Sequence, residues 1–284
     1  MAKIVWLASY PKSGNTWFRM FLANYLKDSK EPLPLEDIER TTISSSPEEF
    51  EDESAINPFE LTSEEVDNYR PANYRSVAAN SPERLIFKKT HDAYTINRKG
   101  EPIFPGDASY GAVYFVRNPL DVAISYANHN TSGLDKVICT MIKENAFIGG
   151  RVGDQLRQIL LTWDNHYYSW QNQNQIPVHS VRYEDMVMKP KEIFGSIVNW
   201  LELPYDEERI DRALNNSNFK TLQEMEQRDG FRERLQNCKQ FFWKGKIGNY
   251  RDHLTKEQVE LLIENFKKLM LQLGYIDERG ELTI

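Results

Sequence analysis

The sequence predicts an α/β fold in which a mostly parallel central sheet forms the middle of three layers. Two observations support this fold class. Apolar runs of strand length recur along the 284 residues, and most of them are followed by a turn and then by apolar residues at helical spacing. Strands that alternate with helices in this way favour a parallel sheet covered on both faces. We expect a single domain over residues 1–284, which is long enough to bury a substantial core.

The first strand-turn-helix unit opens the chain. Ile4–Ala8 is an apolar run of strand length, Tyr10–Asn15 carries turn formers, and a helix begins at Thr16. A second unit follows, with a buried strand at Tyr110–Val116 and a helix at Leu120–His129. The remaining expected elements, in chain order, are strand 85–91, helix 155–171, strand 179–183 and helices 190–201, 207–215, 219–225 and 256–273.

Composition excludes some classes of function. The net charge of −7 argues against sequence-independent nucleic-acid binding, because such binding needs a basic face. No run approaches the roughly 20 apolar residues of a membrane span, and Ile4–Ala8 is too short for the core of a signal peptide. Cys139 and Cys238 lie far apart in sequence, so we expect free thiols in a reducing cytoplasm.

An acidic insert at about 28–84 interrupts the alternation. The segment from Glu36 to Asp67 contains twelve acidic residues and one basic residue, Arg40. The sparse apolar residues indicate short helices and loops over the core. Two interpretations stay open: a solvated acidic surface, or a mobile cover over a pocket for a neutral or cationic acceptor.

The first turn has the features of a phosphate-binding loop. Backbone N–H groups at a helix N-terminus favour an anion, and Lys12 adds a positive charge beside Gly14. In a nucleoside-triphosphate loop the lysine follows the last glycine, whereas here it precedes Gly14 by two residues. The order is therefore wrong for an ordinary kinase or ATPase. The simpler alternative is an ordinary turn that only needs a glycine.

Side chains suited to binding or proton transfer follow several of the expected strands. They are Lys12, His91, Arg117 and Tyr183. Ligands of open parallel sheets bind beyond the carboxyl ends of the strands, so we expect these four at one edge. A later aromatic and basic run, Phe241–Arg251, has two glycines three residues apart and predicts an ordered loop that makes a second phosphate contact or is a basic surface turn.

These motifs resemble the cytosolic-type sulfotransferases, and the compact N-terminus is similar to bacterial small-molecule sulfotransferases. The resemblance implies a P-loop nucleotide-hydrolase-like sulfotransferase fold, with 3′-phosphoadenosine 5′-phosphosulfate (PAPS) as donor and 3′-phosphoadenosine 5′-phosphate (PAP) as product. The matching segments are the phosphosulfate loop Tyr10–Trp17, Lys89-Thr-His91, the 3′-phosphate segment Phe115–Tyr126, Trp163–His166 with Trp170, and Arg182–Met186.

The resemblance implies a role for each candidate residue. His91 would be the base, with Lys89 beside it, and Lys12 would balance charge on the leaving phosphate. The expected donor-binding residues are Lys12, Ser13, Gly14, Asn15, Thr16, Trp17, Arg117, Ser125, Tyr183, Ser217, Lys244 and Gly245. Structural roles stay open for some of them, since a lone histidine is often structural and Trp17 or Tyr183 could be core aromatics.

One departure from the family pattern concerns the 3′-phosphate. Trp243 stands where the family has an arginine, so Lys244, Arg117 and Ser125 must carry that charge, with Lys246 as a further candidate. The five histidines show no paired ligand spacing, and we expect no metal.

The sequence therefore predicts an enzyme that moves a sulfuryl group from PAPS to a hydroxyl group, with an amine as the second choice. The acceptor would be a small molecule, a natural product or a carbohydrate, and its identity is not given by the sequence. Two alternatives are a Mg²⁺-dependent nucleotide kinase and a non-catalytic nucleotide-binding protein. We expect no nucleic-acid partner and no membrane span, and a homodimer is left open.

Overall fold

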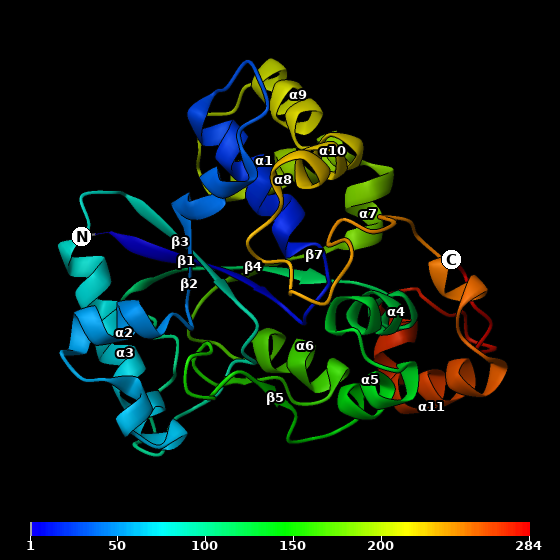
Figure 1. Cartoon of the computed structure of the whole chain (residues 1–284), viewed down its shortest axis with the longest axis horizontal. Coiled ribbons are helices and arrows are strands. Elements are labelled where there is room, and N and C mark those ends of the chain that lie inside the picture. The colour runs from blue at the N-terminus through cyan, green and yellow to red at the C-terminus, as the bar shows by residue number, and fades with distance from the viewer. Residues whose placement is uncertain (1) are drawn as a thin grey trace. The chain divides into compact units, whose positions relative to one another are not determined.

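The computed structural model describes residues 2–284, without the side chains of residues 38–41 (Figure 1). The chain divides into two compact units. Unit 1 holds the chain up to Tyr10 together with Thr41–Phe115 and Lys143–Ser180. Unit 2 is made of Pro11–Arg40, Val116–Ile142 and Val181–Ile284.

A five-stranded sheet has the strand order β2-β3-β1-β4-β7 (Figure 1). The strands are β1 (Lys3–Ser9), β2 (Thr41–Ile43), β3 (Leu85–Thr90), β4 (Ser109–Val116) and β7 (Val178–Arg182). Strand β1 pairs in parallel with both β3 and β4, and β2 pairs in parallel with β3. The predicted α/β class with a mostly parallel sheet is therefore confirmed.

Register brings the ends of the central strands together. Ala8 of β1 lies opposite Thr90 of β3 and Tyr114 of β4. All of β1 except Lys3 is buried, which its continuous apolar sequence requires of a central strand. The buried Trp6 donates its indole N–H to Ser109 Oγ at 2.8 Å, so its one polar atom is satisfied.

The helices of unit 1 include much of the acidic insert. They are α2 (Pro47–Ser54), η2 (Pro58–Glu60), α3 (Ser63–Asn80) and α6 (Trp163–Gln171). Acidic residues occupy the first turns of α2 and α3, where the helix dipole favours negative charge. Thr62 and Glu65 close a capping box at the start of α3. Part of the acidic composition is therefore accounted for by helix N-termini.

The predicted helix at 155–171 is only half correct. Its first part forms strand β6 (Gln158–Ile159), which pairs antiparallel with β5 (Phe147–Ile148). Leu161 has a left-handed φ of 58°, which interrupts a helix, and Thr162 then caps α6 by accepting from Asn165 N. The local periodicity could not reveal this, because the first part makes its hydrogen bonds with distant segments.

The remaining helices lie in unit 2. They are α1 (Asn15–Lys27), η1 (Leu35–Arg40), α4 (Pro119–Asn130), α5 (Leu134–Met141), α7 (Tyr183–Met188), α8 (Pro190–Trp200), α9 (Glu207–Asn216), α10 (Phe219–Asp229), η3 (Asn249–Asp252) and α11 (Lys256–Gln272). Of these, α1, α4, α8, α9, α10 and α11 were predicted, with shifts in their ends, and the others were not. The rings of Phe21 and Phe194, both fully buried, meet edge to face at 4.6 Å between α1 and α8.

Two further predictions concern single features. Cys139 is an exposed free thiol and Cys238 a buried one, as predicted. Of the helices in residues 2–284, none combines the length and the apolar character that crossing a membrane requires.

Candidate active site

The loop between β1 and α1 reverses the chain through left-handed residues. Lys12 has a φ of 69° and Gly14 a φ of 99°. A left-handed conformation costs a residue with a side chain about 1–2 kcal/mol, so Lys12 is held in place by its surroundings. Gly14 is the N-cap of α1, and its carbonyl accepts from Phe18 N at 3.2 Å. The first N–H groups of α1 have no acceptor within the helix itself, and this end of the helix opens onto the loop.

This loop has the properties of an anion cradle. A Cβ atom at Gly14 would lie 2.7 Å from Tyr183 Cδ2, so only glycine fits there. Ser13 is 1% exposed, and its Oγ has no hydrogen-bond partner in the part of the chain that the structure describes. A buried hydroxyl of this kind is suited to bond a phosphate oxygen that reaches the helix N-terminus.

Arg117 links the loop to two other segments of unit 2. Its Nη1 donates to the carbonyl oxygen of Lys12 at 3.2 Å, and its Nη2 donates to that of Lys246 at 3.3 Å. Its guanidinium lies over the ring of Tyr183, 4.2 Å from the centroid. Tyr183 in turn donates its hydroxyl to the carbonyl of Gly245 at 3.2 Å. Burial raises the pKa of Tyr183, which keeps that hydroxyl protonated.

The run 241–251 is an ordered loop, as predicted. Gly245 and Gly248 have positive φ, and a Cβ atom at Gly245 would lie 2.5 Å from the ring of Phe219. Asp121, in the first turn of α4, accepts from the main-chain N–H of Gly248 at 2.8 Å and of Tyr250 at 3.0 Å. The loop is therefore anchored by a buried carboxylate.

Two of the lysines that were predicted to bind phosphate make contacts within unit 2. Lys12 Nζ lies over the ring of Phe241, 3.7 Å from the centroid. Lys244 Nζ donates to Asn249 Oδ1 at 3.0 Å and to His253 Nε2 at 2.8 Å, and lies over the ring of Trp243. Trp243 therefore packs against the ammonium group of Lys244 and adds no positive charge of its own.

The structure brings most of the predicted donor-binding residues together in unit 2, but not all. Trp17 meets Tyr183 edge to face at 6.1 Å. Asn15 and Thr16 begin α1 and are buried. Ser125 lies half-buried on α4, and its role stays a prediction. Ser217 is fully buried and donates its hydroxyl to the carbonyl of Ala213 at 2.7 Å, an ordinary contact at the end of α9.

His91 lies in unit 1, directly after β3. Its Nδ1 is 2.8 Å from the carbonyl oxygen of Ser9 and 3.3 Å from Ser9 Oγ. A carbonyl oxygen can only accept, so Nδ1 carries the hydrogen and the neutral ring keeps its lone pair on Nε2. That tautomer is the one a base requires if it acts through Nε2. Lys89 precedes it on β3 and is half-buried.

Helix α6 holds the main chain of His91. His166, fully buried, donates from Nε2 to the carbonyl of His91 at 3.0 Å and accepts at Nδ1 from the hydroxyl of Tyr114 at 2.7 Å. Trp170 Nε1 donates to the carbonyl of Asp92 at 3.0 Å. His166 and Trp170, which the sequence singled out, therefore hold the main chain of the candidate base and of the residue after it, a role that their spacing alone did not predict.

Comparison with known proteins identifies the family. A family profile described as "Sulfotransferase domain" matches residues 3–274, and the chain belongs to this family of sulfotransferases. Sulfotransferase 1B1 of Mus musculus is 24% identical over 271 residues, which cover 93% of this chain and 81% of the relative. Cytosolic sulfotransferase 1 of Arabidopsis thaliana is 24% identical over 272 residues, which cover 91% and 76%.

A solved structure supports the fold. The crystal structure of retinol dehydratase in complex with androsterone and inactive cofactor PAP superposes with a TM-score of 0.61 at 21% sequence identity. The similarity covers 94% of this chain and 80% of that one.

The steric constraint at Gly14 leads to a stability prediction. Gly14→Ala should lower the free energy of unfolding through its left-handed φ and through overlap with the Tyr183 ring. Gly100→Ala is the matched control, because Gly100 also has a positive φ of 79° but has open space around it. We expect Gly14→Ala to lose about 1–3 kcal/mol more than Gly100→Ala in urea titrations. Equal losses would show that the ring does not exclude a methyl group.

His166 should make folding sensitive to acid. Burial lowers its pKa to about 4, below the value of about 6.5 for an exposed histidine. The unfolded chain therefore takes up the proton first, and stability that is complete above pH 6.5 is lost as the pH falls toward 4. We expect this residue to lower the free energy of unfolding by about 3 kcal/mol between pH 7 and pH 4. In urea titrations, the free energy of unfolding of the wild type should fall by about 3 kcal/mol more than that of His166→Gln between pH 7 and pH 4. Parallel pH profiles of the two proteins would contradict the prediction.

Proposed function

We propose that this sulfotransferase moves a sulfuryl group from PAPS to a hydroxyl group of a small-molecule acceptor and releases PAP. The observation that carries the proposal is the convergence of Arg117 and Tyr183 on the loop at Lys12–Gly14, with the carbonyl of Gly245 bonded to Tyr183. The retinol dehydratase structure, which holds PAP, supports the choice of donor.

The residues of unit 2 described above fit a donor with two phosphate groups. The N–H groups at the start of α1 and the buried hydroxyl of Ser13 suit the 5′-phosphate. Arg117 offers a planar fork for the 3′-phosphate, with Lys244 and Ser125 as further candidates. Trp17, which is half-buried, would stack on adenine, with the buried Tyr183 beside it. When bound, the donor supplies the sulfuryl group and a phosphate leaving group.

The chemistry assigned to the protein is proton transfer and charge stabilisation. His91 would accept the proton of the acceptor hydroxyl at Nε2, because its Nδ1 proton is donated to Ser9. Lys12 would balance the negative charge that develops on the leaving phosphate oxygen. Lys89 would add positive charge near the base.

The acceptor is proposed only as a class. A hydroxyl compound of the natural-product or carbohydrate type is consistent with an oxygen nucleophile that needs a base of near-neutral pKa. The solved relative binds androsterone, which supports a small-molecule acceptor. A cytoplasmic location is part of the proposal, since one relative is named cytosolic.

Donor binding distinguishes this proposal from a nucleotide kinase. PAP without metal should stabilise the protein by about 2.7 kcal/mol at one hundred times its dissociation constant, seen as a rise of several degrees in Tm. ATP with Mg²⁺ should give a clearly smaller shift at the same concentration. A shift with ATP and Mg²⁺ but none with PAP would favour the kinase and overturn the proposal.

Substitution of the base and the cation tests catalysis. We expect His91→Ala to lower kcat by about 10²–10⁴-fold while the affinity for PAP stays unchanged. Lys12→Ala should lower kcat by about 10²–10³-fold, because it removes the positive charge that balances the leaving phosphate. Transfer of labelled sulfate from PAPS measures both, with His179→Asn as a control at a half-buried histidine outside the candidate site. Unchanged turnover in both variants would show that neither residue takes part in the transfer, and no transfer by the wild type would favour a non-catalytic nucleotide-binding protein.

A further inference from the structure

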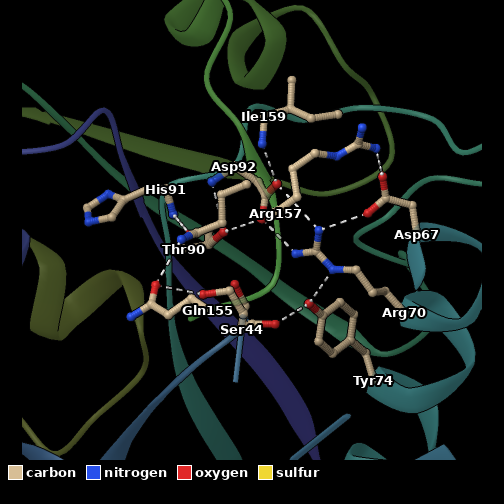
Figure 2. Close-up of polar contacts among 12 residues, drawn as sticks. Ser44, Asp67, Arg70, Tyr74, Thr90, His91, Asp92, Gln155, Arg157 and Ile159 are labelled. Atoms are coloured by element: carbon tan, nitrogen blue, oxygen red, sulfur yellow. Dashed lines mark hydrogen bonds and ion pairs between the residues drawn. The ribbon is translucent and has the colours of Figure 1, made fainter. Parts of the chain in front are cut away.

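A buried ion-pair network joins the segment of His91 to helix α3 (Figure 2). Its central pair is Arg70 and Asp92, whose side chains are each 2% exposed. Arg70 Nη2 lies 2.6 Å from Asp92 Oδ2, and Arg70 Nη1 lies 3.4 Å from Asp92 Oδ1. The planar guanidinium therefore faces both carboxylate oxygens, a geometry that fixes direction as well as distance.

Arg70 is itself held by neighbours in unit 1. Its Nε donates to the hydroxyl of Tyr74 at 3.1 Å, and that hydroxyl donates to the carbonyl of Ser44 at 2.8 Å. Its Nη1 also donates to Asp67 Oδ1 at 3.3 Å. Asp67 Oδ2 accepts from Arg157 Nη2 at 2.7 Å, so one carboxylate bridges two arginines (Figure 2).

Asp92 connects this network to the main chain around His91 through hydrogen bonds. Its Oδ1 accepts from the main-chain N–H of Ile159 at 2.9 Å, and its own N–H donates to Thr90 Oγ1 at 3.1 Å. The next hydrogen bond in this region runs from the N–H of His91 to Gln158 Oε1 at 2.9 Å. The residues on both sides of His91 and the segment at 158–159 are thus fixed together.

The ring of His91 points away from the network, whereas its main chain is joined to it (Figure 2). The direction of the ring is set by its own main chain and by the bond from Nδ1 to Ser9 O. A small rotation of the 90–92 segment would lengthen that hydrogen bond, and the proton would then no longer be held on Nδ1. Whatever holds Asp92 therefore also holds Nε2 in its direction.

We propose that Arg70 and Asp92 are positioning residues for His91, which keep its Nδ1 on Ser9 O and its Nε2 oriented for proton transfer. This inference rests on the proposed function, because it takes His91 as the base. A buried ion pair is weak evidence for a stabilising role, since apolar residues of similar volume are often as stable. Its two-pronged geometry next to a candidate base is better accounted for by orientation.

The test uses the full chain with Asp92→Asn, which keeps an acceptor oxygen for Ile159 N but removes the charge that Arg70 faces. We expect kcat to fall about 10–100-fold, while the KM of the acceptor and the affinity for PAP change less than about twofold. Long-range proton–nitrogen NMR of the imidazole should show the wild-type ring protonated at Nδ1 and a mixture of tautomers in the variant.

A second variant guards against simple unfolding. Arg70→Met combined with Asp92→Leu replaces both charges by apolar side chains, so no unpaired charge is buried. It should remain folded by circular dichroism and should show the same loss of kcat and the same tautomer mixture. The control is Glu49→Gln, which removes the negative charge from another ion pair of unit 1. In that pair Glu49 Oε1 lies 2.6 Å from Nζ of Lys88, a buried residue of β3. This variant should leave kcat unchanged.

The outcomes separate the two proposals. Wild-type kcat and an Nδ1-protonated ring in both network variants, together with an inactive His91→Ala, would overturn the positioning role and leave the proposed function standing. A wild-type protein without sulfuryl transfer, or an active His91→Ala, would overturn both. An equal loss of kcat in Glu49→Gln would also overturn the inference, because it would mark a general effect of lost buried charge.

Discussion

The left-handed turn at Lys12 and Gly14 is the constraint on which the donor side of the molecule depends. The chain passes from β1 to α1 only if Gly14 lacks a side chain, because the ring of Tyr183 fills that space. Tyr183 stacks with Arg117, and Arg117 holds the carbonyl of Lys12. Each contact therefore supports the next, and the strain at Lys12 is maintained by a closed set of neighbours.

Much of the fold followed from local patterns. Strands β1 and β4 are buried apolar runs, and α9 and α11 lie within one residue of their predicted ends. The segment before α6 was predicted wrongly because its structure is set at long range. Ile159 bonds to Asp92 and Leu160 to Ala146, and neither partner leaves a periodic trace in the sequence. The acidic insert was described only by composition, which does not distinguish a helix cap from a buried Asp67.

The candidate site divides in the same way. Lys12, Arg117 and Tyr183 could be found because they follow strands, where ligands bind in parallel sheets. The anchoring of the 245–251 loop by Asp121 could be seen only in the structure. Arg70 and Asp92 were not found, since one lies in the insert and the other beside a motif residue. A charged residue directly after a histidine at a strand end was the only available signal.

The contact between Lys12 and Phe241 bears on how strongly an anion can be held. An ammonium group that rests on a ring 3.7 Å away has already exchanged part of its water shell for the ring's negative face. Recruiting it to a phosphate then costs less dehydration and less loss of side-chain freedom than recruiting a lysine from bulk solvent. Phe241 thus keeps the ammonium group of Lys12 partly dehydrated. The area of its ring therefore affects anion affinity, although the ring itself does not contact the anion.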